Sequence, residues 1–188
     1  MNKHGNKRAQ NTRKKIESYF LELLMEKPLE KITVQEICRG ININRSTFYM
    51  HYEDIYNLFS KMEEEMSKKI AGIFYDEKTE KYRKFNITRY VELFEYVQEN
   101  RSFYSLYLNG VGKNYTINIY VAQLSEKMLE VFLENALEEE RKMLNYRIEF
   151  FNAGINALIR RWLSTGCKET PNELADIVVK ESNLFSMW

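Results

Sequence analysis

Residues 32–58, ITVQEICRGININRSTFYMHYEDIYNL, contain the pattern that decides the fold at the N-terminal end of the chain. Thr33 and Glu36 have the spacing of a capping box, in which the threonine hydroxyl accepts from the amide three residues later and the glutamate accepts from the threonine amide. A short helix is therefore predicted directly after Thr33. Its apolar residues Val34, Ile37 and Cys38 are expected to face inward.

A turn and a second short helix are predicted next. Residues 40–44 (GININ) interrupt the helical periodicity. Asn42 is expected in the left-handed conformation, because its short polar side chain tolerates positive φ. Asn44 is a suitable N-cap for a helix from residue 45 to about residue 50. Two short helices joined by a turn of about four residues form the layout of a helix-turn-helix.

Longer helices are predicted on both sides of this pair. The apolar residues of the preceding helix recur at the spacing of one helical face; they are Ile16, Tyr19, Phe20, Leu23 and Leu24. This helix should end before Pro28. Glu53 and Asp54 then favour the N-terminus of a fourth helix. We predict a three-helix helix-turn-helix domain over residues 1–53 and a helical domain over residues 54–188, with the boundary within the fourth helix rather than in a loop.

The remainder of the chain shows only helical patterns. Seven glycines and two prolines are too few for the turns of a β-rich fold of 188 residues. Caps and periodicity predict helices over residues 86–100, 101–108, 115–137 and 138–164, and a last helix begins at the capping box of Thr170 and Glu173. The predicted fold class is all-α, with about nine helices.

The composition is that of a globular protein, but its charge is uneven. Hydrophobic residues make up 44% and charged residues 29% of the chain, with a net charge of +1. Residues 1–52 contain ten Lys/Arg and five Glu, a balance of +5, whereas the rest contains eighteen Lys/Arg and twenty-two acids, a balance of −4. A basic N-terminal arm precedes the first acid and comprises Lys3, Lys7, Arg8, Arg13, Lys14 and Lys15. Such an arm is typical of proteins that bind a polyanion at one end.

No pattern indicates a metal, a cofactor, a membrane span or a secretory signal. Cys38 and Cys167 lie far apart and match no metal-ligand spacing. No apolar run approaches the length of a membrane span, and no apolar segment follows the basic N-terminus. We therefore expect a cytoplasmic protein that needs no cofactor.

The same segment closely resembles the DNA-binding signature of the TetR family of transcriptional regulators. That signature opens with Thr-Val-x-x-Ile and ends with Thr-(Phe/Leu)-Tyr-x-His-(Tyr/Phe). The matching residues are Thr33, Val34, Ile37, Thr47, Phe48, Tyr49, His51, Tyr52 and Leu58. The resemblance implies a homodimeric regulator of double-stranded operator DNA, with a C-terminal domain of the Firmicutes type.

The second short helix is the expected element of DNA contact. A helix in the major groove offers base edges its N-terminal residues, which here are Asn44, Arg45, Ser46 and Thr47. An arginine pairs with guanine and an asparagine with adenine, whereas Thr33, Tyr49 and His51 are expected at phosphates. The alternatives are that Arg45 and Ser46 are merely exposed, and that His51 only packs. Phe48 and Val34 are assigned to the core.

Two departures from the family pattern bear on DNA binding. Ile41 and Asn42 stand where the family usually has Ala-Gly, and Ile55 stands where it commonly has a lysine that meets a phosphate. The basic N-terminal arm could replace that contact, especially through Arg8, Arg13, Lys14 and Lys15. Truncation of residues 1–11 should then flatten the salt dependence of DNA binding, and an unchanged slope would refute this hypothesis.

The resemblance also implies a dimer interface and an effector pocket in the C-terminal domain. The interface is expected on the last two helices, at Gly154, Ile155, Leu158, Ile159, Trp162, Leu174, Ile177 and Val178. The pocket is expected among Phe94, Phe103, Tyr104, Tyr107, Tyr120, Met128 and Phe150. Both sets have a simpler interpretation, in which they pack only within their own chain. No inward charge for an ionic effector is identified, so the effector is expected to be apolar or aromatic, or absent.

The sequence bears on three kinds of function. An enzyme is disfavoured, because no nucleophile–base pair, glycine-rich phosphate loop or cluster of histidines with carboxylates is found. The favoured function is a repressor released from its operator by a small molecule. The alternative is an activator that works with a protein coactivator, as in some members of this branch of the family.

Overall fold

The computed structural model describes residues 3–76, 78–79, 81–82, 86–108 and 138–185. Its described part is helical apart from one short hairpin, in agreement with the all-α prediction. The elements are α1 (Lys3–Glu26), η1 (Leu29–Lys31), α2 (Val34–Gly40), α3 (Arg45–Tyr49), α4 (Ile55–Phe74), β1 (Tyr75–Asp76), β2 (Lys81–Tyr82), α5 (Ile87–Glu99), α6 (Arg101–Leu106), α8 (Glu138–Ser164) and α9 (Pro171–Phe185). The predicted helix over residues 115–137 lies outside the described residues.

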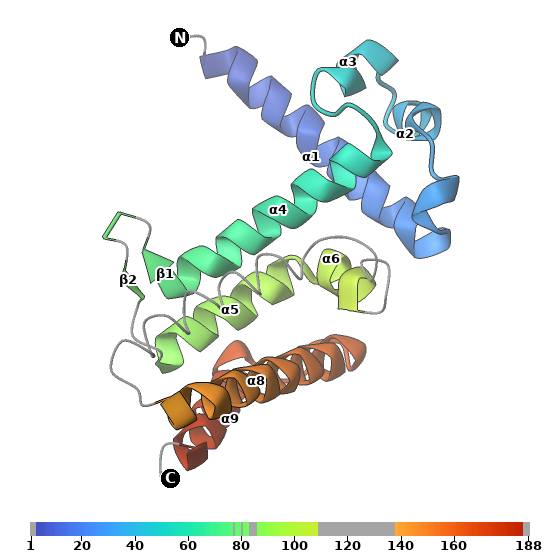
Figure 1. The fold of residues 1–188 in the computed structure, drawn as a ribbon. Helices are drawn as coiled ribbons and strands as arrows, with labels where there is room; N and C mark the ends of the chain where they lie inside the picture. Colours follow the sequence, from blue (N-terminus) through green and yellow to red (C-terminus); the bar gives the residue numbers. More distant parts are fainter. Residues whose placement is uncertain (1–2, 77, 80, 83–85, 109–137, 186–188) are drawn as a thin grey trace.

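The helices form two groups connected by α4 (Figure 1). The first group contains α1, α2 and α3 at the N-terminal end, and the second contains α5, α6, α8 and α9. The long helix α4 leaves the first group and runs alongside α5, while α9 packs closely against the other side of α5. The described residues include no helix that is both long and apolar enough to cross a membrane.

Side-chain caps determine where several helices begin. Thr33 Oγ1 accepts from the Glu36 amide at 3.2 Å, which confirms the predicted start of α2. The Glu36 carboxylate, however, pairs with Lys27 instead of completing the capping box. Asp54 is the N-cap of α4 and accepts from the Asn57 amide at 2.7 Å. The last helix does show a complete box at Thr170 and Glu173.

The hairpin of β1 and β2 was not predicted from the sequence. Tyr75 pairs with Tyr82 and Asp76 with Lys81, in antiparallel register. Each strand has two residues, which is too short for an alternating pattern to be visible in the sequence. Tyr75 is also the C-cap of α4, so the hairpin ends that helix.

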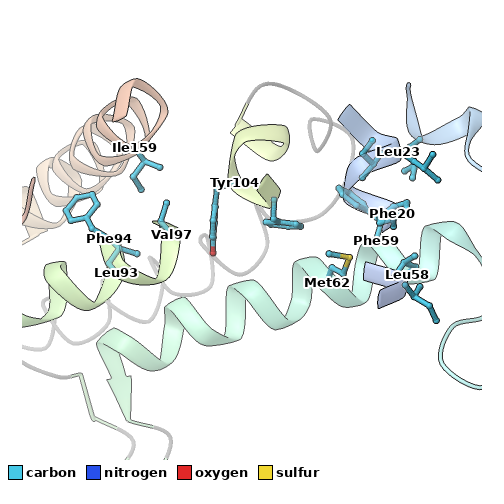
Figure 2. Packing of buried hydrophobic residues seen from close by; sticks show 14 of the residues in the cluster. Phe20, Leu23, Leu58, Phe59, Met62, Leu93, Phe94, Val97, Tyr104 and Ile159 are labelled. Carbon is cyan, nitrogen blue, oxygen red and sulfur yellow. The ribbon is translucent and has the colours of Figure 1, made fainter. Parts of the chain in front are cut away.

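One hydrophobic core extends through both groups of helices (Figure 2). Phe59 of α4 links them, because its ring contacts Phe20 of α1 at 6.3 Å and Phe103 of α6 at 6.4 Å between centroids. Tyr104 lies between the cluster around Phe59 and the cluster around Phe94 (Figure 2). The division into domains at residues 53 and 54 stays a prediction.

Candidate nucleic-acid interface

The turn between α2 and α3 has the geometry expected of a helix-turn-helix. Asn42 adopts φ of 53°, as predicted for this position. The Ile43 amide donates to the Cys38 carbonyl at 2.9 Å, which ties the turn to α2. Gly40 packs against the ring of Tyr19, so closely that a Cβ atom here would lie 2.1 Å from two ring carbons. The turn is therefore held against α1 as well as α2.

A single buried ring holds α3 in place. Phe48 has no exposed surface, and it contacts the rings of Tyr49 and Tyr52 at 5.7 and 5.8 Å between centroids. Because Phe48 is inward, the residues that precede it on this short helix turn toward solvent. The packing of Phe48 thus determines which side of α3 is available to a partner.

The exposed side of α3 contains most of the predicted base-contacting residues. Asn44, Arg45 and Ser46 are exposed, and Thr47 is half-buried. Asn44 is the N-cap of α3 by its backbone angles, but its side chain makes no capping hydrogen bond within the described helix. The Arg45 guanidinium donates to Gln35 Oε1 of α2 at 2.6 Å. Gln35 was not singled out from the sequence, because its role depends on α2 and α3 lying side by side.

The predicted phosphate-contacting residues lie around the two helices. Tyr49 is 55% exposed and His51 is half-buried. Thr33 is exposed, but its hydroxyl already accepts from the Glu36 amide. The backbone carbonyl of His51 accepts from Lys61 Nζ at 3.2 Å.

Lys61 was not found by sequence reasoning. This residue of α4 is exposed, and its ammonium lies 5.6 Å from the centre of the Tyr52 ring. Ile55, which stands where the family commonly has lysine, is buried in the core. Lys61 therefore places a cation next to the C-terminal end of α3, although no spacing within the signature indicates it.

The basic N-terminal arm is the first part of α1 rather than an extended tail. Lys7, Arg8, Lys14 and Lys15 are exposed. The expectation that Arg13 is available for DNA needs correction, because Arg13 pairs with Glu17 of α1 and Glu65 of α4.

Arg13 belongs to a polar network that joins α1 to the start of α4. The Tyr52 hydroxyl donates to Glu17 Oε1 at 2.7 Å, and that oxygen also accepts from Arg13 Nε at 2.7 Å. Burial, together with the hydrogen bond and negative charge of Glu17, raises the pKa of Tyr52 above its ordinary value. The network therefore positions the helix-turn-helix relative to α4.

Three of the predicted effector-contacting residues lie together, because the Phe103 ring contacts the rings of Tyr104 and Tyr107. Phe94, Phe103 and Tyr104 are buried and Tyr107 is half-buried. Phe150 is 66% exposed on α8, and its predicted role in an effector pocket stays a prediction. The remaining two predicted residues, Tyr120 and Met128, lie outside the described residues. The buried Glu63 of α4 was missed, because an acid inside an apolar stripe is not visible until the facing helices are known.

The predicted dimer interface stays a prediction, and its members differ in their exposure within the single chain. Four of its members are buried within their own chain: Ile159, Trp162, Leu174 and Val178. Trp162, for example, packs edge-on against Phe94 and donates to the Glu169 carbonyl at 2.9 Å. Such side chains have little area left for a second copy. Ile155 and Leu158 are half-buried, whereas Gly154 and Ile177 are exposed.

The large exposed apolar side chains of α8 were not among those predicted for the interface. Met143, Tyr146 and Phe150 are 56%, 70% and 66% exposed. They are separated by three and four residues and therefore share one face of α8. The exposed Gly154 and Ala157 continue the same spacing. This face is called the α8 stripe below.

Comparison with known proteins identifies relatives of both sequence and fold. Residues 86–183 match the family model for the C-terminal region of TetR-type transcriptional regulators. A similar sequence is the HTH-type transcriptional regulator YxbF of Bacillus subtilis (strain 168), with 26% identity over 98 residues. That match covers 50% of this chain but only 26% of the length of YxbF.

Solved structures of similar fold are also transcriptional regulators. A regulator from Aquifex aeolicus covers 93% of this chain and 99% of its own, with 19% identity and a TM-score of 0.64. A TetR-family regulator from Syntrophomonas wolfei covers 95% and 96%, with 17% identity and a TM-score of 0.64. The dihydroxyacetone kinase operon activator DhaS covers 90% and 92%, with 19% identity and a TM-score of 0.57. At these identities the comparison establishes similarity of fold.

Proposed function

The chain belongs to the TetR family of transcriptional regulators, and we propose that it represses transcription by binding operator DNA until a small-molecule effector releases it. The family model matches 98 of the 188 residues, and the family consists of regulators rather than enzymes. The observation that carries the proposal is the exposed N-terminal end of α3, at Asn44, Arg45 and Ser46.

These residues have the chemistry needed to distinguish base pairs. The Arg45 guanidinium can donate two parallel hydrogen bonds to guanine, and the Asn44 amide can both donate to and accept from adenine. Gln35 holds the Arg45 side chain before DNA arrives, which reduces the rotamer entropy lost on binding. Tyr49 and Lys61 lie at the other end of α3, where a hydroxyl and an ammonium can contact phosphates.

A homodimer would present two copies of this DNA-contacting surface. Helix-turn-helix dimers bind half-sites whose centres are about one DNA turn apart. We propose that the α8 stripe and Ile177 of α9 form the dimer contact, because their apolar side chains are exposed in the single chain. Gly154 and Ala157 would let two α8 helices approach closely, while Tyr146 and Phe150 provide most of the area.

The alternative function is an activator that works with a protein coactivator. DhaS is named an operon activator, and its fold is similar to that of this chain. The two functions differ in a simple observation. A repressor alone lowers transcription from a promoter that contains its site, whereas this kind of activator raises transcription only with its partner present.

The proposed function is tested by selecting binding sites from a pool of random double-stranded DNA. The wild-type chain should enrich an inverted repeat whose half-site centres are about 10 base pairs, or a multiple of this, apart. The variant Arg45→Ala should enrich it weakly or not at all. The matched control is Arg101→Ala, which removes an exposed arginine of α6 and should enrich the same repeat as wild type. Failure of the wild-type chain to enrich any sequence would refute the proposal.

A further inference from the structure

Helix α4 contains an acid among the apolar residues that face the core. Phe59, Met62, Glu63 and Met66 lie at the spacing of one helical face, and the first three are buried. Glu63 is only 4% exposed, and its Oε1 atom has no hydrogen-bond partner among the described residues. Buried carboxylates are normally paired, because an isolated charge in an apolar environment is strongly disfavoured. This exception therefore calls for a physical explanation.

The neighbours of Glu63 locate it at the junction of α5 and α6. About one turn before it, Phe59 contacts Phe103 of α6. About one turn after it, the Met66 sulfur accepts from the Tyr96 hydroxyl of α5 at 2.9 Å. Along α4, Glu63 therefore lies between these two contacts. Burial and, after it, the negative charge of Glu63 raise the pKa of Tyr107, the residue that directly follows α6.

A second unpaired polar atom lies at this junction. The Tyr104 hydroxyl is buried and has no hydrogen-bond partner in the part of the chain that the structure describes, and Figure 2 shows it directed toward the side of α4. The Tyr104 ring contacts Tyr96 at 6.3 Å and Phe103 at 5.5 Å between centroids. Phe103 is in turn stacked on Tyr107 at 5.9 Å. The part of α4 that contains Glu63 thus packs against a cluster of four aromatic rings.

We propose that Glu63 is the effector-recognition residue of this chain, and that it pairs with the cationic group of an organic ammonium effector surrounded by Tyr104, Tyr107 and their neighbouring rings. A carboxylate attracts the charge, the tyrosine hydroxyls accept hydrogen bonds from an N–H donor, and aromatic faces attract cations. This chemistry differs from the apolar or aromatic effector expected from the sequence.

The position of Glu63 on α4 connects effector binding to the contacts that hold the helix-turn-helix. Helix α4 begins at Ile55, three residues after Tyr52, and Tyr52 is joined to Glu17 and Arg13 of α1. Arg13 also pairs with Glu65, half a turn from Glu63. A ligand that shifts this part of α4 would therefore move the contacts that position the helix-turn-helix. This step rests on the proposed function, whereas cation binding by Glu63 does not.

Binding is tested on the full chain without DNA, by calorimetric titration with two probes of similar shape. Phenethylamine is a cation at pH 8, and 2-phenylethanol is its neutral counterpart. We expect the wild-type chain to bind the amine at least about tenfold more tightly than the alcohol. The variant Glu63→Gln should reduce this preference to less than about twofold. The control Glu64→Gln, which changes the adjacent and more exposed acid, should retain the preference.

A probe of fixed charge separates recognition from a purely structural role. Affinity for benzyltrimethylammonium should rise with pH as Glu63 ionises, and this dependence should vanish in Glu63→Gln. Among the residues that the structure describes, the titratable groups near Glu63 include Tyr96 of α5, Tyr104 of α6 and Tyr107 directly after α6. All three stay neutral below pH 9, because burial raises their pKa values. Tyr104→Phe should weaken binding of phenethylamine by a few fold while leaving the pH dependence intact.

Two outcomes would overturn the proposal. One is that neither cation binds more tightly than 2-phenylethanol, and the other is that Glu63→Gln retains the wild-type preference. Glu63→Gln should still select the same DNA as wild type, so absence of cation binding by a wild-type chain that selects DNA refutes this inference alone. Loss of DNA selection by the wild-type chain refutes the proposed function and leaves the titrations to be judged separately.

Discussion

The roles of individual side chains here depend on partners from other helices. Arg45 and Arg13 are both cations near the helix-turn-helix, yet Arg45 is held outward by Gln35 whereas Arg13 is paired with two acids. Glu63 and Glu65 are two residues apart, and only Glu63 is buried. Charge and position in the sequence alone do not distinguish these cases.

The burial of Glu63 makes a prediction about stability and pH. Burial raises the pKa of Glu63 from an ordinary 4.5 to about 7. Between these values the unfolded chain releases a proton that the folded chain retains, so this residue lowers stability as pH rises. Above about pH 7 Glu63 ionises in the folded chain as well, and the loss of folding stability no longer grows. The full loss is up to about 3 kcal/mol.

Glu63→Gln removes this titration. Its free energy of unfolding, relative to wild type, should therefore increase by about 2–3 kcal/mol from pH 4.5 to pH 7.5 and then stay constant. Chemical denaturation of both proteins at several pH values measures the difference. A difference that is flat across this range would contradict the burial of the Glu63 carboxyl group.

At the scale of elements, the short helices depend on caps and on one close contact. Gly40→Ala should destabilise the chain by about 1–3 kcal/mol, because the new Cβ would overlap the Tyr19 ring. Gly72→Ala is the matched control. Gly72 lies inside α4, where a Cβ atom would have no described neighbour within 4 Å, so alanine should stabilise by about 0.5–1 kcal/mol. Thermal denaturation of the two variants should give shifts of opposite sign, and equal shifts would contradict the packing of α2 on α1.

The sequence predicted these elements well where the signal is local. The cap at Thr33, the left-handed Asn42 and the box at Thr170 each depend on neighbouring residues, and the structure confirms them. Signals that depend on distant partners were missed. Glu36 pairs with Lys27 instead of completing the capping box with Thr33. Gln35 accepts a hydrogen bond from Arg45 only because α3 packs beside α2.

At the scale of the whole molecule, hydrophobic residues must be divided between the core and an interface. Periodicity identifies an apolar face but does not say which chain covers it. Trp162 and Leu174 are expected at a dimer contact, and in the single chain both are already buried. Phe150 is expected in the effector pocket and Tyr146 is not singled out by the sequence, although both side chains are more than half exposed. The proposed homodimer explains why such large apolar side chains remain on the surface.

The homodimer is tested by placing a charge in the α8 stripe. Met143→Glu and Phe150→Glu should each shift the chain from dimer to monomer, because an acid would lose its hydration in an apolar contact. Met25→Glu is the control, since Met25 is 60% exposed on α1 and Met143 is 56% exposed on α8. Sedimentation velocity reports the mass in solution. A monomeric wild-type chain, or stripe variants that stay dimeric, would contradict the proposed interface.

The central claim is that the N-terminal end of α3 contacts bases, and one measurement tests it most directly. The affinities of wild type and Arg45→Ala are measured on the selected site and on sites with one base pair changed. We expect Arg45→Ala to lose about 1–3 kcal/mol on the selected site and to lose its preference at one base pair in each half-site, with the other preferences kept. An equal loss on every site, or no loss on any, would show that Arg45 does not contact a base and would contradict the claim.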